Sequence, residues 1–203
     1  MSSAIPASAD PADHLTLAMP PVDRVDPDER EDLAVEGRSA LIIPVAGLGA
    51  KVDQWRERAD PVAPGVPAHI TVLVPFLPID RVDEAVCSWL ADSFADAALD
   101  REVVFDEVRS FPSVVWLHPQ DAEPFVRLTE AVHRRWPECP PYEGRHDEVI
   151  PHLTVAHGSD LAHLVQLDLA EDLPLAGTID SVHLYAWTDG QWRDHARFPL
   201  GTV

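Results

Sequence analysis

The stretch Pro67-Ala-His-Ile-Thr-Val-Leu-Val-Pro-Phe76 decides the fold, because its central tetrapeptide occurs twice. The second copy lies in Val149-Ile-Pro-His-Leu-Thr-Val-Ala-His157, with Leu in place of Ile. Each copy follows a proline closely and is apolar and rich in β-branched residues. This composition is typical of β-strands. We therefore expect two equivalent strands, one in each half of the chain.

The histidine and the threonine of each copy are two positions apart, and residues i and i+2 of a strand point to the same face. His69 and Thr71 are therefore expected to project together, as are His152 and Thr154. The apolar residues between them then face a core.

The paired motifs resemble those of the 2H phosphoesterase superfamily, which is named for two His-x-Thr/Ser motifs. That superfamily includes 2′-5′ RNA ligase-like proteins and 2′,3′-cyclic nucleotide phosphodiesterases. The segment 140–155 is similar to the approach to the second motif in bacterial 2′-5′ RNA ligase-like members, and the resemblance covers roughly residues 38–200. It implies a bilobal α+β fold, with two antiparallel sheets and flanking helices around a central cleft.

Hydrophobic periodicity and turn residues give an independent α+β prediction. The expected strands cover residues 38–46, 69–74, 102–109, 113–118, 151–156, 178–187 and 191–198. The expected helices cover residues 50–59, a segment capped by Asp80, and residues 122–136 and 161–169. Residues 1–37 are rich in Pro, Ala, Asp and Glu, which indicates a flexible arm before a domain at 38–203. A strap across the domain, anchored by Leu15, Leu17 and Met19, is the alternative.

The composition limits the partners. The chain has 203 residues and a net charge of −20, and long nucleic acid is normally gripped by a basic surface. Among the substrates that the family resemblance implies, we therefore expect a small nucleotide or an RNA-end cyclic phosphate rather than long nucleic acid. No apolar run approaches 18 residues and no signal peptide is evident, so a cytoplasmic protein without a membrane partner is expected. We also expect a monomer.

Two histidines and two hydroxyls suit the opening of a cyclic phosphodiester without a metal or another cofactor. Histidine has both protonation states available near neutrality, and hydroxyls can donate hydrogen bonds to phosphate oxygens. The family resemblance implies His69 as general acid and His152 as general base, with Thr71 and Thr154 holding the phosphate. The reverse reaction, 2′-5′ RNA ligation, and a non-catalytic module that binds nucleotides or RNA ends remain alternatives.

Other residues near the second motif are weaker candidates. The resemblance suggests that the loop with Tyr142 and Arg145 borders the cleft, where Arg145 could pair with phosphate. A metal site would need a third ligand, which His146, Asp147 or His157 could supply. On an uninterrupted strand, however, the spacing of His157 from His152 turns it to the opposite face.

Overall fold

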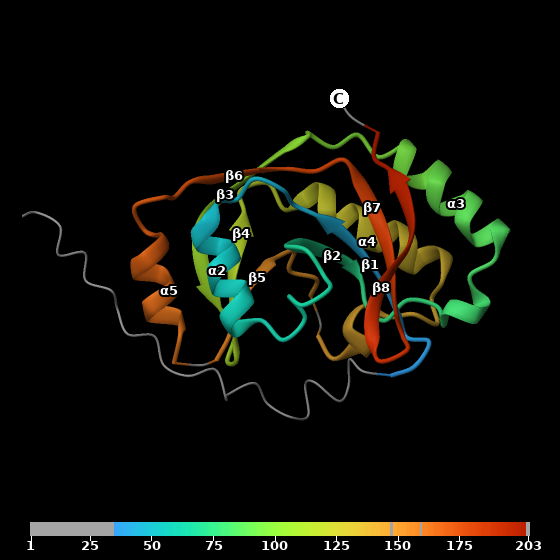
Figure 1. The fold of residues 1–203 in the computed structure, drawn as a ribbon. Helices are drawn as coiled ribbons and strands as arrows, with labels where there is room; N and C mark the ends of the chain where they lie inside the picture. The colour runs from blue at the N-terminus through green and yellow to red at the C-terminus, as the bar shows by residue number, and fades with distance from the viewer. Residues whose placement is uncertain (1–34, 147, 159, 202–203) are drawn as a thin grey trace, which may run out of the picture.

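The computed structural model describes residues 35–146, 148–158 and 160–201, and one eight-stranded antiparallel sheet forms its centre (Figure 1). The strand order is β6-β3-β4-β5-β2-β1-β7-β8. The strands are β1 Ser39–Pro44, β2 His69–Leu73, β3 Glu102–Ser110, β4 Val114–Pro119, β5 Leu153–His157, β6 Leu175–Thr178, β7 Ser181–Thr188 and β8 Gln191–Pro199. The expected arm of residues 1–37 lies outside the described residues except for its last three.

The α+β class is confirmed, but the two expected sheets are one. The motif strands β2 and β5 pair at Ile70 and Leu153, and this pair joins the β6-β3-β4-β5 half to the β2-β1-β7-β8 half. The seam between the halves therefore runs between the two His-x-Thr motifs.

Four helices flank the described sheet: α2 Ala50–Ala59, α3 Glu84–Ala95, α4 Glu123–Arg135 and α5 Ala162–Leu169. The helix α2 packs on β5 and α5 packs on β3 and β4, whereas α3 packs on β8 and α4 on β2. In Figure 1, α2 and α5 accordingly lie with one half of the sheet and α3 with the other. The buried Thr129 hydroxyl of α4 donates to the Val72 carbonyl at 2.7 Å, which ties this helix to the first motif strand.

Apolar residues fill both sides of the sheet near the motifs. The alternate residues Ile70 and Val72 of β2, with Leu153 of β5, lie in the main core beneath the helices. A smaller cluster lies on the other face and contains Ala40, Ile42, Val66, Tyr185 and Trp192. The motif strands therefore have the alternation that the sequence predicts, and their histidines lie opposite the main core.

Two expectations about local structure were wrong. The helix α3 is capped by Asp83, whose carboxylate accepts a hydrogen bond from the Val86 N–H at 2.9 Å, and Asp80 instead lies in the short 3-10 turn Ile79–Arg81. The strand β6 was not expected as a separate element, because four residues with a central glycine carry a weak strand pattern.

Among the described helices, none has the length and apolar character that crossing a membrane requires.

Candidate active site

The pairing of β2 with β5 brings the two motifs together. Ile70 lies opposite Leu153 in an antiparallel register, so continuation of that register places His69 near Thr154 and Thr71 near His152. The two histidines are then diagonal neighbours, a relation that separates Cβ atoms by about 7–8 Å in a regular sheet. His152 is close enough to His69 to be one of the charges that lower the pKa of His69.

Each imidazole is oriented by the backbone two residues before it. His69 Nδ1 lies 2.8 Å from the Pro67 carbonyl, and His152 Nδ1 lies 2.7 Å from the Ile150 carbonyl. A carbonyl only accepts hydrogen bonds, so Nδ1 must carry a proton in both rings. The Nε2 atom of each ring is then left to gain or lose a proton.

The surroundings of both histidines favour the neutral imidazole ring. Burial is the main cause that lowers the pKa of His69 to about 4, and the hydrogen bond to Pro67 and the charge of Asp60 oppose it. Burial also lowers the pKa of His152, with a further contribution from the nearby His146 and His157. Near neutral pH each Nε2 is therefore a proton acceptor.

Aromatic rings account for the burial of His152. Its ring meets Phe111 edge-on with centroids 5.2 Å apart, and Trp116 at 5.6 Å. Tyr142 stacks on it at 6.3 Å with an interplanar angle of 23°. Because Trp116 lies directly across from Thr154 on β4, the sheet register places this ring beside the motif. The sequence pattern placed Trp116 on a strand but contained no signal for its contact with His152.

The loop before β5 places Tyr142 in the site. The Tyr142 backbone N–H donates to the Val74 carbonyl at 2.7 Å, and its phenol shares a hydrogen bond with the Thr71 hydroxyl. Burial raises the pKa of this phenol to about 12, so it stays protonated. Tyr142 therefore contacts one residue of each motif. Arg145, the other candidate in the loop, lies on the exposed side, where its Nη2 donates to Glu143 Oε2 at 2.7 Å.

His157 lies on the same face as His152, contrary to the expectation from spacing. Where β5 pairs with β4, Thr154 lies opposite Trp116 and His157 lies opposite Val114. Trp116 and Val114 are two positions apart on β4, so they share a face. The intervening Val155 has no opposite residue, so it forms a β-bulge that resets the alternation. An uninterrupted strand was the wrong assumption.

A buried ion pair lies next to His69 and His157. The Arg56 guanidinium donates two hydrogen bonds to Asp60 Oδ2, at 3.0 and 2.9 Å, and a third to the Val66 carbonyl. Asp60 Oδ1 accepts from the Val62 N–H and lies 3.9 Å from His157 Nε2. The opposite effects of Arg56 and Asp60 on the pKa of His69 show that both charges act on the site.

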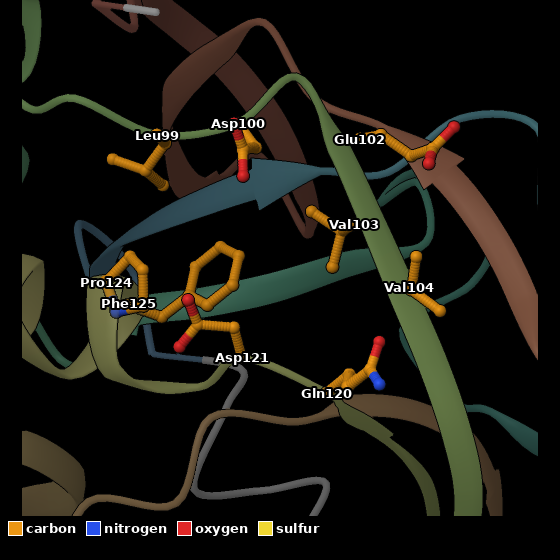
Figure 2. Close-up of a pocket in the computed structure, with 9 residues that line it drawn as sticks. All are labelled: Leu99, Asp100, Glu102, Val103, Val104, Gln120, Asp121, Pro124 and Phe125. Carbon is orange, nitrogen blue, oxygen red and sulfur yellow. The ribbon is translucent and has the colours of Figure 1, made fainter. Parts of the chain in front are cut away.

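A pocket formed by other residues lies apart from this site. It has a volume of about 160 Å³ and lies between the start of β3 and the start of α4, where Asp100, Asp121 and Phe125 contribute to its lining (Figure 2). None of the predicted site residues lines it. Over residues 35–146, 148–158 and 160–201, no group of three or more His, Cys, Asp or Glu side chains is arranged to hold a metal ion; Asp147 lies outside these ranges.

Known proteins resemble the chain over most of its length. A protein of Bacillus cereus (strain AH820) named "Putative phosphoesterase" is 28% identical over 168 residues, which is 79% of this chain and 95% of that protein. A protein of Bacillus anthracis (strain CDC 684) with the same name has the same identity and coverage. Among solved structures, E. coli LigT in complex with NADP+ has a TM-score of 0.49 and 19% identity, over 82% of this chain and 98% of that chain. The sequence model of the family described as the 2′-5′ RNA ligase superfamily matches residues 44–191. The chain therefore belongs to this superfamily of 2H phosphoesterases.

Proposed function

We propose that the protein is a metal-independent phosphodiesterase that opens 2′,3′-cyclic or related cyclic phosphates of nucleotides or RNA ends. The observation that carries this proposal is the pair of imidazoles with Nδ1 bound to a carbonyl and Nε2 left for proton transfer. Continuing the register of the Ile70–Leu153 pair sets each histidine opposite the threonine of the other motif. One acid, one base and two hydroxyl donors are the groups that an in-line attack on phosphorus requires.

In the proposed reaction, water attacks phosphorus while His152 Nε2 takes its proton. The bond from phosphorus to one ribose oxygen breaks, and His69 Nε2–H gives a proton to that oxygen. The product is a nucleoside monophosphate. This assignment of acid and base follows the family resemblance, and Thr71 and Thr154 donate to the non-bridging oxygens.

The acid must gain its proton when the substrate binds, because the pKa of both histidines is lowered in the free protein. An anionic phosphate beside an imidazole favours the charged form and raises its pKa. The substrate itself therefore completes the acid–base pair.

Hydrolysis of adenosine 2′,3′-cyclic phosphate in the presence of EDTA tests the proposal. We expect turnover to survive chelation, and His69→Ala and His152→Ala each to lower kcat by roughly 10²–10⁴-fold. The double variant should lose much less than the product of the two losses, because groups that act as a unit are not additive. Full activity in either single variant would remove that histidine from the reaction. A parent protein that binds the ligand without turnover would instead support the binding module.

A further inference from the structure

A turn beside the histidine pair holds one carboxylate between two guanidinium groups. Glu143 Oε1 accepts a hydrogen bond from Arg38 Nη2 at 2.8 Å, and Glu143 Oε2 accepts one from Arg145 Nη2 at 2.7 Å. The two oxygens thus bind two different arginines. Arginine forks match phosphate as well as carboxylate, so a phosphate group has the charge and the acceptors to replace Glu143.

Arg38 lies on the same side of the sheet as the motifs. It directly precedes β1, where its carbonyl accepts from the Trp187 N–H, so the strand alternation places it on the face of Ala40 and Ile42. Ile42 pairs with Thr71 of the first motif. Arg38 precedes Ile42 by four residues, so the backbone of Arg38 lies about 13 Å along the strand from this pair. Arg38 is therefore too far along the strand to belong to the cradle of the reacting phosphate.

The carboxylate is held in a strained turn. Tyr142 and Glu143 have φ values of 50° and 60°, in the left-handed region that is unfavourable for residues other than glycine. Strain of this kind persists only where surrounding contacts enforce it, and it is concentrated at functional sites. Here the enforcing contacts are the Tyr142 N–H bond to Val74 and the Arg38–Glu143 pair.

Burial distinguishes the fixed partner from the replaceable one. The Arg38 side chain is 15% exposed, whereas Glu143 is 36% exposed and lies in the turn. The arginine side chain is thus largely buried, and the carboxylate is the partner that solvent reaches more readily. An anion that displaced Glu143 would itself pair with Arg38, so the buried guanidinium would keep a negatively charged partner.

We propose that Arg38, together with Arg145, forms a second anion subsite that binds a further phosphate of the nucleotide substrate. Glu143 occupies this subsite until that phosphate displaces it. The inference rests on the proposed function for the reacting phosphate, and it names the substrate class as nucleotides that carry a cyclic phosphate and a second phosphate. The second group can be a 5′-phosphate, the phosphodiester before an RNA end, or the pyrophosphate of a dinucleotide-like molecule.

The kinetic test compares adenosine 2′,3′-cyclic phosphate with the same compound bearing a 5′-phosphate. We expect kcat/KM for the two-phosphate compound to exceed that for the one-phosphate compound by roughly tenfold, the usual worth of one charge-assisted hydrogen bond. Arg38→Gln should bring this ratio close to one. Glu143→Gln should raise it several-fold, because the amide keeps an acceptor for Arg38 but loses the competing charge.

Arg81→Gln is the matched control. Arg81 forms an exposed pair with Glu138 at 3.3 Å, outside the site, and its loss should leave the ratio unchanged. A dinucleotide ending in a cyclic phosphate and ADP-ribose 1″,2″-cyclic phosphate serve as two further substrates. The compound with the largest drop in Arg38→Gln identifies the source of the second phosphate.

A binding measurement separates failure of the subsite from failure of the proposed reaction. Calorimetric titration compares adenosine 2′-phosphate with adenosine 2′,5′-bisphosphate in the parent protein, Arg38→Gln and Glu143→Gln. Tighter binding of the bisphosphate that depends on Arg38 supports the subsite even if no cyclic phosphate is hydrolysed. Equal affinity for the two ligands, together with a kinetic ratio that neither variant moves, would overturn the subsite and leave the hydrolase proposal intact.

Discussion

At each histidine, one backbone carbonyl determines which ring nitrogen faces the substrate. The acceptor is the residue two positions earlier in both motifs, Pro67 for His69 and Ile150 for His152. The sequence could predict that each histidine shares a face with its threonine, because that relation depends only on strand alternation. It could not predict the tautomer or the aromatic enclosure of His152, which come from residues distant in the chain.

Tyr142 provides a test of that enclosure. Tyr142→Ala should raise the pKa of His152 towards its ordinary value of about 6.5, because water replaces the stacked ring. Tyr142→Phe should leave the pKa of His152 low and remove only the hydrogen bond to Thr71, with a loss of turnover of roughly tenfold. NMR titration of the imidazole C–H signals measures the first effect. An unchanged His152 titration in Tyr142→Ala would contradict the proposed cause of the low pKa.

The histidine pair should also make the protein sensitive to acid. His69 stays neutral in the folded state down to about pH 4, whereas it titrates near 6.5 in an unfolded chain. Between these values the unfolded chain binds more protons, so stability is lost as the pH falls from about 6.5 to about 4. For His69 the loss is at most about 3 kcal/mol, and partial solvent contact reduces it.

Urea unfolding at pH 7 and pH 5 measures this effect. His69→Gln should reduce the difference in the free energy of unfolding between the two pH values. His163→Gln, at an exposed position of α5, is the control and should leave the difference unchanged. An equal pH dependence in the parent protein and His69→Gln would show that the acid sensitivity arises elsewhere.

At the level of elements, a β-bulge and a buried ion pair shape the site. Helix α2 and most of the strands could be predicted because their hydrophobic periods are regular and prolines limit them. The bulge at Val155 could not, because one unpaired residue changes no composition and shows only in the register against β4. For that reason His157 was expected on the wrong face. The predicted capping residue of α3 was wrong because several acidic residues precede this helix. Only the hydrogen bond from the Val86 N–H to the Asp83 carboxylate shows which of them is the cap.

The Arg56–Asp60 pair should stabilise the segment between α2 and β2. Both residues are buried, at 5% and 4% exposure, and they share two hydrogen bonds. Asp60→Ala leaves a buried guanidinium without its charge partner, so we expect a loss of about 3–5 kcal/mol in the free energy of unfolding. The double variant Arg56→Met/Asp60→Leu should lose clearly less, because neither charge remains.

The control for this pair is Glu123→Ala, which breaks an exposed i,i+4 pair with Arg127 in α4. A change within about 0.5 kcal/mol is expected there. Chemical denaturation of all variants provides the comparison. Losses at Asp60 as small as those at Glu123 would show that the buried pair contributes little.

At the scale of the whole molecule, one core spans both halves of the sheet. The main cluster contains Val103 and Phe105 from β3 together with Val182 and Leu184 from β7, which lie on opposite sides of the seam. The duplicated motif predicted one equivalent strand in each half of the chain, but the sequence contained no signal that these strands, β2 and β5, pair directly. Pairing between distant strands depends on the packing of the whole chain, which a local pattern does not encode.

This shared core predicts that the halves unfold together. We expect a single thermal transition, with far-UV and near-UV circular dichroism coinciding and the calorimetric and van't Hoff enthalpies equal. Leu153→Ala, at a fully buried position of the seam, should lower the free energy of unfolding by about 2–5 kcal/mol and keep one transition. Leu167→Ala, at a position of α5 that is 59% exposed, should change it by no more than about 0.5 kcal/mol. Two resolved transitions in the parent protein would show that the seam separates two cooperative units, and in that case the geometry of the histidine pair would depend on their docking.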